Sequence, residues 1–213
     1  LNFGFARFKL PPSARMILIG ADGRAALGPY TAADQLPTGQ LWTQVLNGSS
    51  ALIELSVADG EQDQVDVRLS RIGHGYRGFG YLTKHCKSGA CNMDVACLGD
   101  GDPWNAPRRS AGAITIGGTD TCSGSLVNNT NNDRRMLFAT ATHCGLNAGN
   151  IGSVLVYWNY ESPTCRAPGS SASGIPTPRP GTTSAGLAFI ASTQSPFGGG
   201  ATGPRADWTL VEL

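Results

Sequence analysis

The sequence predicts an all-β protein in two parts: an antiparallel β-sandwich over residues 1–80, and a second unit of six strands within residues 91–213. Three observations support this fold class. In the first part, apolar and polar residues alternate with a period of two between Asp-Gly and Asn-Gly turns. In the second part, six short strand-like runs are separated by polar or Gly/Pro-rich loops. Residues 1–80 contain no segment of any length with the 3.6-residue apolar period of a helix.

The sandwich prediction rests on five segments before residue 80. Leu1, Phe3 and Phe5 alternate with small or polar residues, which indicates the first strand. The other four strand-like segments are residues 16–19, 41–46, 53–57 and 65–69. A period of two indicates strands with one buried face. Trp42 and Tyr30 could face a ligand, but packing in the core or at its rim is the preferred interpretation. These residues contain no acid pair, histidine cluster or phosphate loop.

The prediction for the second part rests on six strand-like runs: 113–116, 122–127, 136–141, 154–158, 185–190 and 208–213. The Gly-rich stretch 74–80 has a composition typical of the segment in which a chain leaves a domain. Residues 81–90 are expected to be a linker that is open to proteolysis. We expect the chain to be a piece of a longer one, because it begins without Met and stops directly after a strand-like run.

Composition narrows the classes of function. The formal net charge is +1, so neither nucleic acid nor an anionic membrane is an expected partner. No apolar run approaches the ~18 residues of a membrane span. Charged residues make up 15% and the chain has 29 glycines and six cysteines, which favours a secreted protein with disulfides. His85 with Cys86, Cys91 and Cys97 fits no common zinc spacing, so we expect neither a metal nor a cofactor.

His143 is the candidate catalytic residue. It ends a strand-like run and Cys144 follows at once, so a strand and a disulfide could hold the imidazole toward a cleft. A buried histidine beside a structural cysteine is the alternative. A general base needs an acid to orient it, and the acids after His143 are Glu161, Asp207 and Glu212. Asp207 is preferred because a long loop enters a strand there, although an aspartate at that place could simply cap its own loop.

These segments resemble a known family. Thr140-Ala-Thr-His-Cys144 matches the T-A-x-H-C box of trypsin-like serine proteases, and Asp207-Trp-Thr-Leu210 is similar to the segment that holds their catalytic aspartate. Cys122-Ser-Gly-Ser-Leu126 resembles the strand that carries the partner cysteine. A narrower resemblance, to bacterial lysyl endopeptidases, covers about residues 88–213 and is carried by 91–97, 125–130, 156–160 and 165–168.

The resemblance implies two six-stranded barrels with the active site between them, of which this chain holds the first. It implies His143 as general base and Asp207 as the orienting acid. The nucleophilic serine, absent from these 213 residues, would come with a C-terminal barrel of the same chain. Ser123 is not that nucleophile, because it precedes the histidine on a barrel strand.

The disulfide pairs implied by the resemblance are Cys122–Cys144 and Cys97–Cys165. Cys91 would pair with the missing barrel, and would here be free or joined to Cys86. Each native bridge is typically worth ~2–4 kcal/mol.

Lysine usage adds a hypothesis about processing and specificity. The lysines are Lys9, Lys84 and Lys87, against thirteen arginines. A lysine-cleaving enzyme benefits from a mature domain without lysine, so we expect self-processing after Lys87, or Lys84, with a mature start near Ser88. A GC-rich genome would also favour arginine. The expected substrates are proteins or peptides; the alternative is a non-catalytic secreted β-rich binding or adhesion protein that kept half a protease fold.

Overall fold

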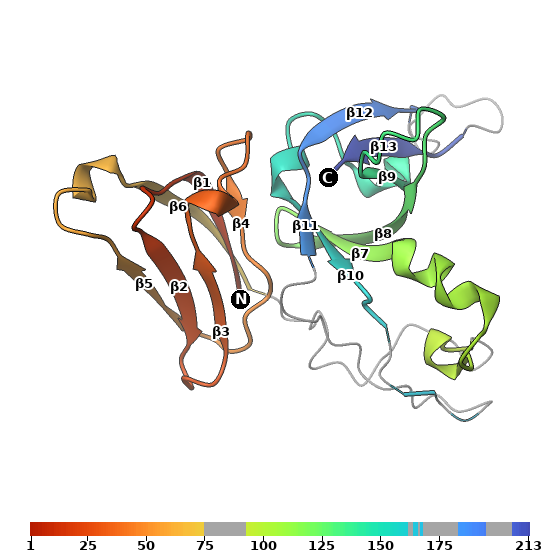
Figure 1. Cartoon of the computed structure of the whole chain (residues 1–213), viewed down its shortest axis with the longest axis horizontal. Helices are drawn as coiled ribbons and strands as arrows, with labels where there is room; N and C mark the ends of the chain where they lie inside the picture. The colour runs from red at the N-terminus through yellow and green to blue at the C-terminus, as the bar shows by residue number, and fades with distance from the viewer. Residues whose placement is uncertain (75–92, 162–163, 166, 168–182, 195–205) are drawn as a thin grey trace.

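The structure is a computed structural model that describes residues 1–74, 93–161, 164–165, 167, 183–194 and 206–213 (Figure 1). The fold is all-β, as predicted: the helices in these ranges are single 3-10 turns of three or four residues. None of the helices in this part of the chain is long and apolar enough to cross a membrane.

The first part is a sandwich of two three-stranded antiparallel sheets. One sheet places β1 (Asn2–Lys9) between β4 (Leu41–Trp42) and β6 (Asp66–Gly73). The other places β2 (Arg15–Gly20) between β3 (Ala26–Tyr30) and β5 (Ala51–Ser56). Phe5, Phe8, Met16 and Leu18 are all less than 4% exposed and form the shared core. Two details differ from the prediction: β3 was not expected, and only two residues of 41–46 are strand.

The two aromatic residues singled out from the sequence serve packing. Tyr30 packs edge-on against Phe8, with ring centroids 6.5 Å apart. The Trp42 indole covers Gly4, where an added Cβ would lie 2.6 Å from the ring. The β1 strand therefore needs glycine at this position, and the packing interpretation of Trp42 and Tyr30 is confirmed.

The second part is one seven-stranded antiparallel sheet in the order β11-β10-β7-β8-β9-β13-β12. Its strands are β7 (Ala111–Ile116), β8 (Asp120–Val127), β9 (Leu137–Thr140), β10 (Val154–Trp158), β11 (Thr183–Ala185), β12 (Ala188–Ser192) and β13 (Thr209–Glu212). Their inward side chains form a second core, in which Ile114, Phe138, Val156 and Val211 are fully buried.

The sheet closes on itself through Gly186 and Leu187. These two residues join β11 and β12, which lie at opposite ends of the strand order. The Gly186 N–H donates to the Val154 carbonyl at 3.0 Å, and the Leu187 N–H donates to the Glu212 carbonyl at 2.8 Å. The predicted run 185–190 is thus split between two strands, because the chain changes its ladder partner from β10 to β13 at this point.

The sandwich docks on the barrel through direct contacts. Asn2 Nδ2 donates to the Gly118 carbonyl at 3.1 Å, and Gln44 Nε2 donates to Thr183 Oγ1 at 2.9 Å. A Cβ added at Gly118 would lie 2.7 Å from the Asn2 side chain and 2.9 Å from the Trp42 ring. The β7–β8 turn and the edge of β11 are therefore part of an interface with residues 1–74.

Candidate active site

The pairing of β9 with β13 brings the two candidate segments together. Thr140, the last residue of β9, is in register with Thr209, the first residue of β13. Because the strands are antiparallel, the chain leaving β9 runs beside the chain entering β13. His143 lies in the 3-10 turn Thr142–Cys144, which ends at Gly145 with a φ of +80°. Glycine takes this left-handed conformation without a Cβ clash.

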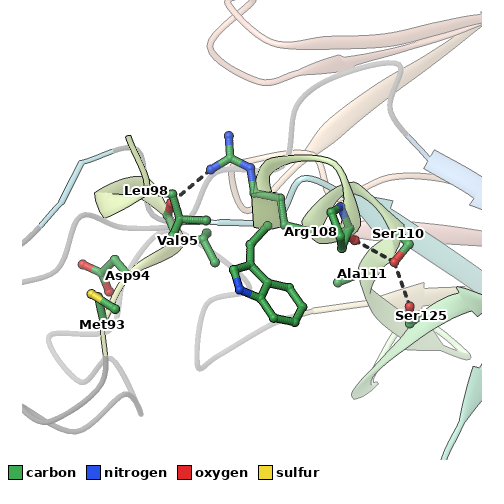
Figure 2. A pocket seen from close by; sticks show the side chains of 10 residues that line it. Met93, Asp94, Val95, Leu98, Arg108, Ser110, Ala111 and Ser125 are labelled. Atoms are coloured by element: carbon green, nitrogen blue, oxygen red, sulfur yellow. Dashed lines mark hydrogen bonds between the residues drawn. The ribbon is translucent and has the colours of Figure 1, made fainter. Parts of the chain in front are cut away.

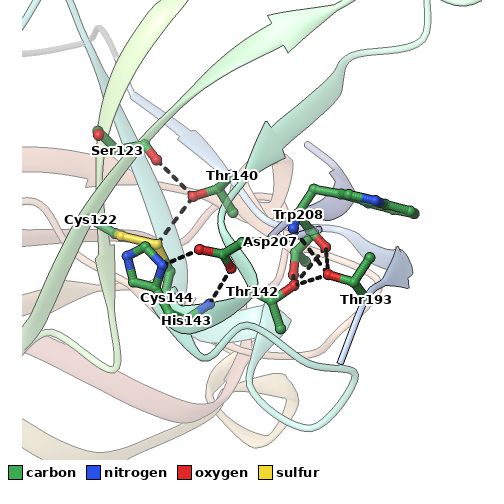
Figure 3. A network of polar contacts seen from close by, with 10 residues as sticks. Cys122, Ser123, Thr140, Thr142, His143, Cys144, Thr193, Asp207 and Trp208 are labelled. Atoms are coloured by element: carbon green, nitrogen blue, oxygen red, sulfur yellow. Dashed lines mark hydrogen bonds and ion pairs between the residues drawn. A yellow bond between two sulfur atoms is a disulfide. The ribbon is translucent and has the colours of Figure 1, made fainter. Parts of the chain in front are cut away.

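His143 and Asp207 are joined by two hydrogen bonds (Figure 3). The Nδ1 atom of His143 lies 2.5 Å from Asp207 Oδ2, and the His143 backbone N–H donates to Asp207 Oδ1 at 3.1 Å. The carboxylate thus holds both the ring and the backbone of the same residue. The side chains are 48% and 26% exposed, respectively, so the pair lies at the surface.

The electrostatics follow from this geometry. The hydrogen bond from the His143 side chain is the largest cause that lowers the pKa of Asp207, and the His143 backbone N–H adds to it. Asp207 therefore stays ionised at neutral pH. With a proton on Nδ1 directed at the carboxylate, Nε2 carries the lone pair of the neutral imidazole.

A disulfide braces the turn that carries His143. Cys122 in β8 is bonded to Cys144, the residue after the histidine. Thr140 Oγ1 donates to the Ser123 carbonyl at 2.7 Å, which ties the end of β9 to the same strand. Cys122, His143 and Cys144 place possible metal-ligand atoms within 4.8 Å of one another. The two sulfurs are bonded to each other, however, and metals bind the thiolate form of cysteine.

The other two candidate acids lie elsewhere. Glu212 forms a two-point ion pair with Arg135, with Nη2–Oε2 at 2.5 Å and Nε–Oε1 at 2.9 Å. Arg135 is the main cause that lowers the pKa of Glu212. Glu161 follows β10, which is three strands from β9 in the sheet order. Asp207 is the acid that the fold places against His143.

Several residues named from the sequence fall outside the described ranges: Lys84, His85, Cys86, Lys87, Ser88 and Cys91. Cys97 is described and forms a disulfide with Cys165, so it offers no thiolate to a zinc ion. Among the described residues, the two disulfides join the pairs that the resemblance implied.

Sequence reasoning missed a hydroxyl cluster beside the dyad. Thr142 and Thr193 hydrogen-bond to the backbone of Trp208, the residue after Asp207 (Figure 3). The Thr209 hydroxyl donates to the Thr142 hydroxyl at 3.4 Å. No local pattern pointed to Thr193, which is 51 positions from Thr142.

A concave surface lies on the segment that precedes β7. It is a largely apolar groove of about 430 Å³ lined by Met93, Val95, Leu98, Trp104, Pro107 and their neighbours (Figure 2). Trp104 is 66% exposed and Met93 is 77% exposed. Arg108 Nη1 donates to the Val95 carbonyl at 3.0 Å and holds one wall. Neither His143 nor Asp207 lines this groove.

Fold and site together define the class: an all-β barrel protein whose disulfide-braced turn presents a hydrogen-bonded imidazole–carboxylate pair. The family is given by comparison with known proteins. The model of the lysyl endopeptidase C-terminal domain matches residues 85–197, more than half of the chain. The chain belongs to this family, and it is related to proteases. The match ends before Asp207, so the placing of that residue rests on the geometry above.

One curated relative extends the comparison. A lysyl endopeptidase of Pseudomonas aeruginosa is 28% identical over 142 residues, which cover 58% of this chain and 29% of the relative. The chain therefore spans less than a third of the relative that it matches.

Proposed function

We propose that these residues form part of a secreted serine endopeptidase of the trypsin-like class that cleaves peptide bonds by acyl transfer, with preference for the bond after lysine. The observation that carries the proposal is the His143–Asp207 pair, with Nδ1 2.5 Å from Oδ2, in a chain of the lysyl endopeptidase family. The two disulfides are in keeping with an extracellular protein.

The proposed mechanism assigns one role to each residue of the pair. His143 Nε2 takes the proton from a serine hydroxyl as that oxygen attacks the scissile carbonyl, and then returns it to the leaving amine. Asp207 accepts the Nδ1 proton, which fixes the tautomer and stabilises the imidazolium while it is charged. The serine, the oxyanion hole and the pocket for the substrate side chain are supplied from a C-terminal barrel of the same protein.

The test of the dyad is Asp207→Asn in the full-length protein. We expect kcat on a lysyl peptide substrate to fall by ~10⁴, because asparagine stabilises the wrong tautomer, with the circular dichroism spectrum unchanged. Asp100→Asn is the control, since Asp100 is exposed and lies apart from the dyad; it should retain wild-type kcat. Activity of Asp207→Asn within a few-fold of wild type would remove Asp207 from the mechanism.

The proposal also includes a preference for cleavage after lysine and self-processing at the lysines before Ser88. All three lysines precede Ser88, and the matched family takes its name from cleavage at lysyl bonds. N-terminal sequencing of the secreted protein should give a start at Ser88, or at His85 if Lys84 is cut. A start elsewhere would contradict self-processing at these lysines.

The apolar groove favours a second candidate, a non-catalytic binding protein that kept half of a protease fold. Exposed apolar concavities are typical of sites that bind other molecules. A serine-directed fluorophosphonate probe separates the two candidates. It should label the full-length protein at one serine and leave residues 1–213 unlabelled; an unlabelled full-length protein would favour the binding role.

A further inference from the structure

Three groups link the residue before His143 to the residue after Asp207. Thr142 Oγ1 donates to the Trp208 carbonyl at 2.7 Å, and the Trp208 N–H donates to Thr193 Oγ1 at 3.1 Å. The two threonine hydroxyls are 2.9 Å apart. One proton per hydroxyl satisfies this arrangement if Thr193 donates to Thr142. We call Thr142, Thr193 and the Trp208 backbone the threonine clamp (Figure 3).

The threonine clamp holds the backbone that connects Asp207 to the sheet. Asp207 precedes β13, outside its ladder, and is joined to the sheet through Trp208. The Thr193 N–H also donates to the Trp208 carbonyl at 3.0 Å, so Thr193 and Trp208 pair just beyond the ends of β12 and β13. Thr142 connects this pair to the turn of His143, directly next to the imidazole-bearing residue.

Burial alone does not fix the dyad. The side chains of His143 and Asp207 are 48% and 26% exposed, so packing leaves them room to move. Catalytic groups must be held within about 0.5 Å of the productive geometry, and directional hydrogen bonds to the neighbouring backbone can provide this where packing does not.

We propose that Thr142 and Thr193 are positioning residues that hold the Asp207 carboxylate against Nδ1 of His143. The effect on turnover rests on the proposed protease function, whereas the effect on the His143–Asp207 hydrogen bond does not. Thr142 stands at the variable position of the T-A-x-H-C box, so its hydroxyl is a feature of this chain and not a requirement of the motif.

The experiment compares Thr142→Val, Thr142→Ser and Thr193→Val in the full-length protein labelled with ¹⁵N-histidine. Valine keeps the shape of threonine and removes the hydroxyl, and serine keeps the hydroxyl. The first readout is the NMR signal of the Nδ1-bound proton of His143, which a hydrogen bond to Asp207 moves downfield. We expect the signal to move upfield or broaden in both valine variants and to stay in place in Thr142→Ser.

The second readout is kinetic. A misplacement of about 1 Å can cost ~10²-fold in rate, so kcat should fall by ~10–100-fold in the valine variants at nearly constant KM. Thr142→Ser should recover to within a few-fold. Thr121→Val, which removes an exposed hydroxyl in β8, is the control and should change neither readout.

The outcomes separate the two proposals. Valine variants that keep both the wild-type proton signal and the wild-type kcat overturn the clamp. If the valine variants move the proton signal but the wild-type protein has no peptidase activity, the threonine clamp is retained and the proposed protease function is rejected. If Thr142→Val fails to fold, Thr193→Val decides the question, because it removes the hydroxyl that receives the Trp208 N–H and leaves the segment of His143 intact.

Discussion

At the scale of single residues, two carboxylates of the same segment have different partners. Asp207 uses both of its oxygens on His143, whereas Glu212, five residues further on, uses both of its oxygens on Arg135. The two acids differ in what the backbone beside them does: Glu212 is the last residue of β13, and Asp207 precedes its first. The loop position lets Asp207 turn toward the neighbouring segment.

This pairing predicts a pH-dependent contribution to stability. The pKa of Asp207 is lowered in the folded protein by its bonds to His143. The stabilisation is therefore fully present above its ordinary pKa of 3.8 and is lost as the pH falls through the lower folded value. Melting temperatures of wild type and Asp207→Asn should differ at pH 5 and converge as the pH approaches 2. A gap that stays constant over this range would contradict the assignment.

At the scale of elements, a pair of glycines makes room for the aromatic core of the barrel. Gly112 in β7 and Gly124 in β8 are opposite one another in the ladder. A Cβ at Gly112 would lie 2.5 Å from the Val156 side chain, and one at Gly124 would lie 2.4 Å from the Phe138 ring. Phe138 in turn packs edge-on against Trp158, with ring centroids 5.8 Å apart. Strand-interior glycines often mark such close approaches.

Gly124→Ala should therefore destabilise the barrel. The added methyl would also meet the Ala139 carbonyl at 2.4 Å, and backbone cannot move aside as a side chain can. Overpacking of this kind costs about 1–3 kcal/mol, measured as a lower urea midpoint at constant slope. Gly99→Ala is the matched control, because a Cβ there meets nothing within 4 Å. Equal midpoints for the two variants would show that the space beside Phe138 is not limiting.

At the scale of the whole molecule, the sandwich and the barrel have separate cores joined by an interface. Tyr157 of β10 is 1% exposed, and burial raises its pKa to about 12. The Val45 backbone, from the sandwich, acts in the opposite direction and lowers the pKa of this phenol. At another contact between the two parts, a Cβ added at Gly152 would lie 3.1 Å from the Thr38 side chain and 3.3 Å from the Gln40 side chain. An interface with such close contacts couples the two cores.

We expect this coupling to make unfolding cooperative across both parts. Gly152→Leu would place a side chain where Thr38 lies 3.1 Å from the added Cβ, and should push the sandwich away from the barrel. Wild type should unfold in one urea transition by both tryptophan fluorescence and circular dichroism, and Gly152→Leu in two. Gly99→Leu is the size-matched control and should retain one transition. A single transition in Gly152→Leu would argue against the coupling.

Local sequence patterns anticipated much of this fold because strands leave a readable signal. Alternation around Val65–Leu69 and the continuous run at Val154–Trp158 correspond to β6 and β10. The prediction was poorer where tertiary contacts override local preference. Ala26–Tyr30 contains Gly and Pro and was not expected to be a strand, yet it pairs with β2. The run 185–190 changes partner at Gly186, which no alternation reveals.

The sequence by itself determined the all-β class and the short list of candidate groups: one histidine at a strand end and three acids after it. Only the tertiary structure decided which acid meets the imidazole, and it assembled the threonine clamp from segments 51 positions apart. The physical reason is the separation along the chain of the residues that determine each property. Strand periodicity is a local property of the chain, whereas the contact of residue 143 with residue 207 depends on the antiparallel register between β9 and β13, which the packing of the whole barrel sets.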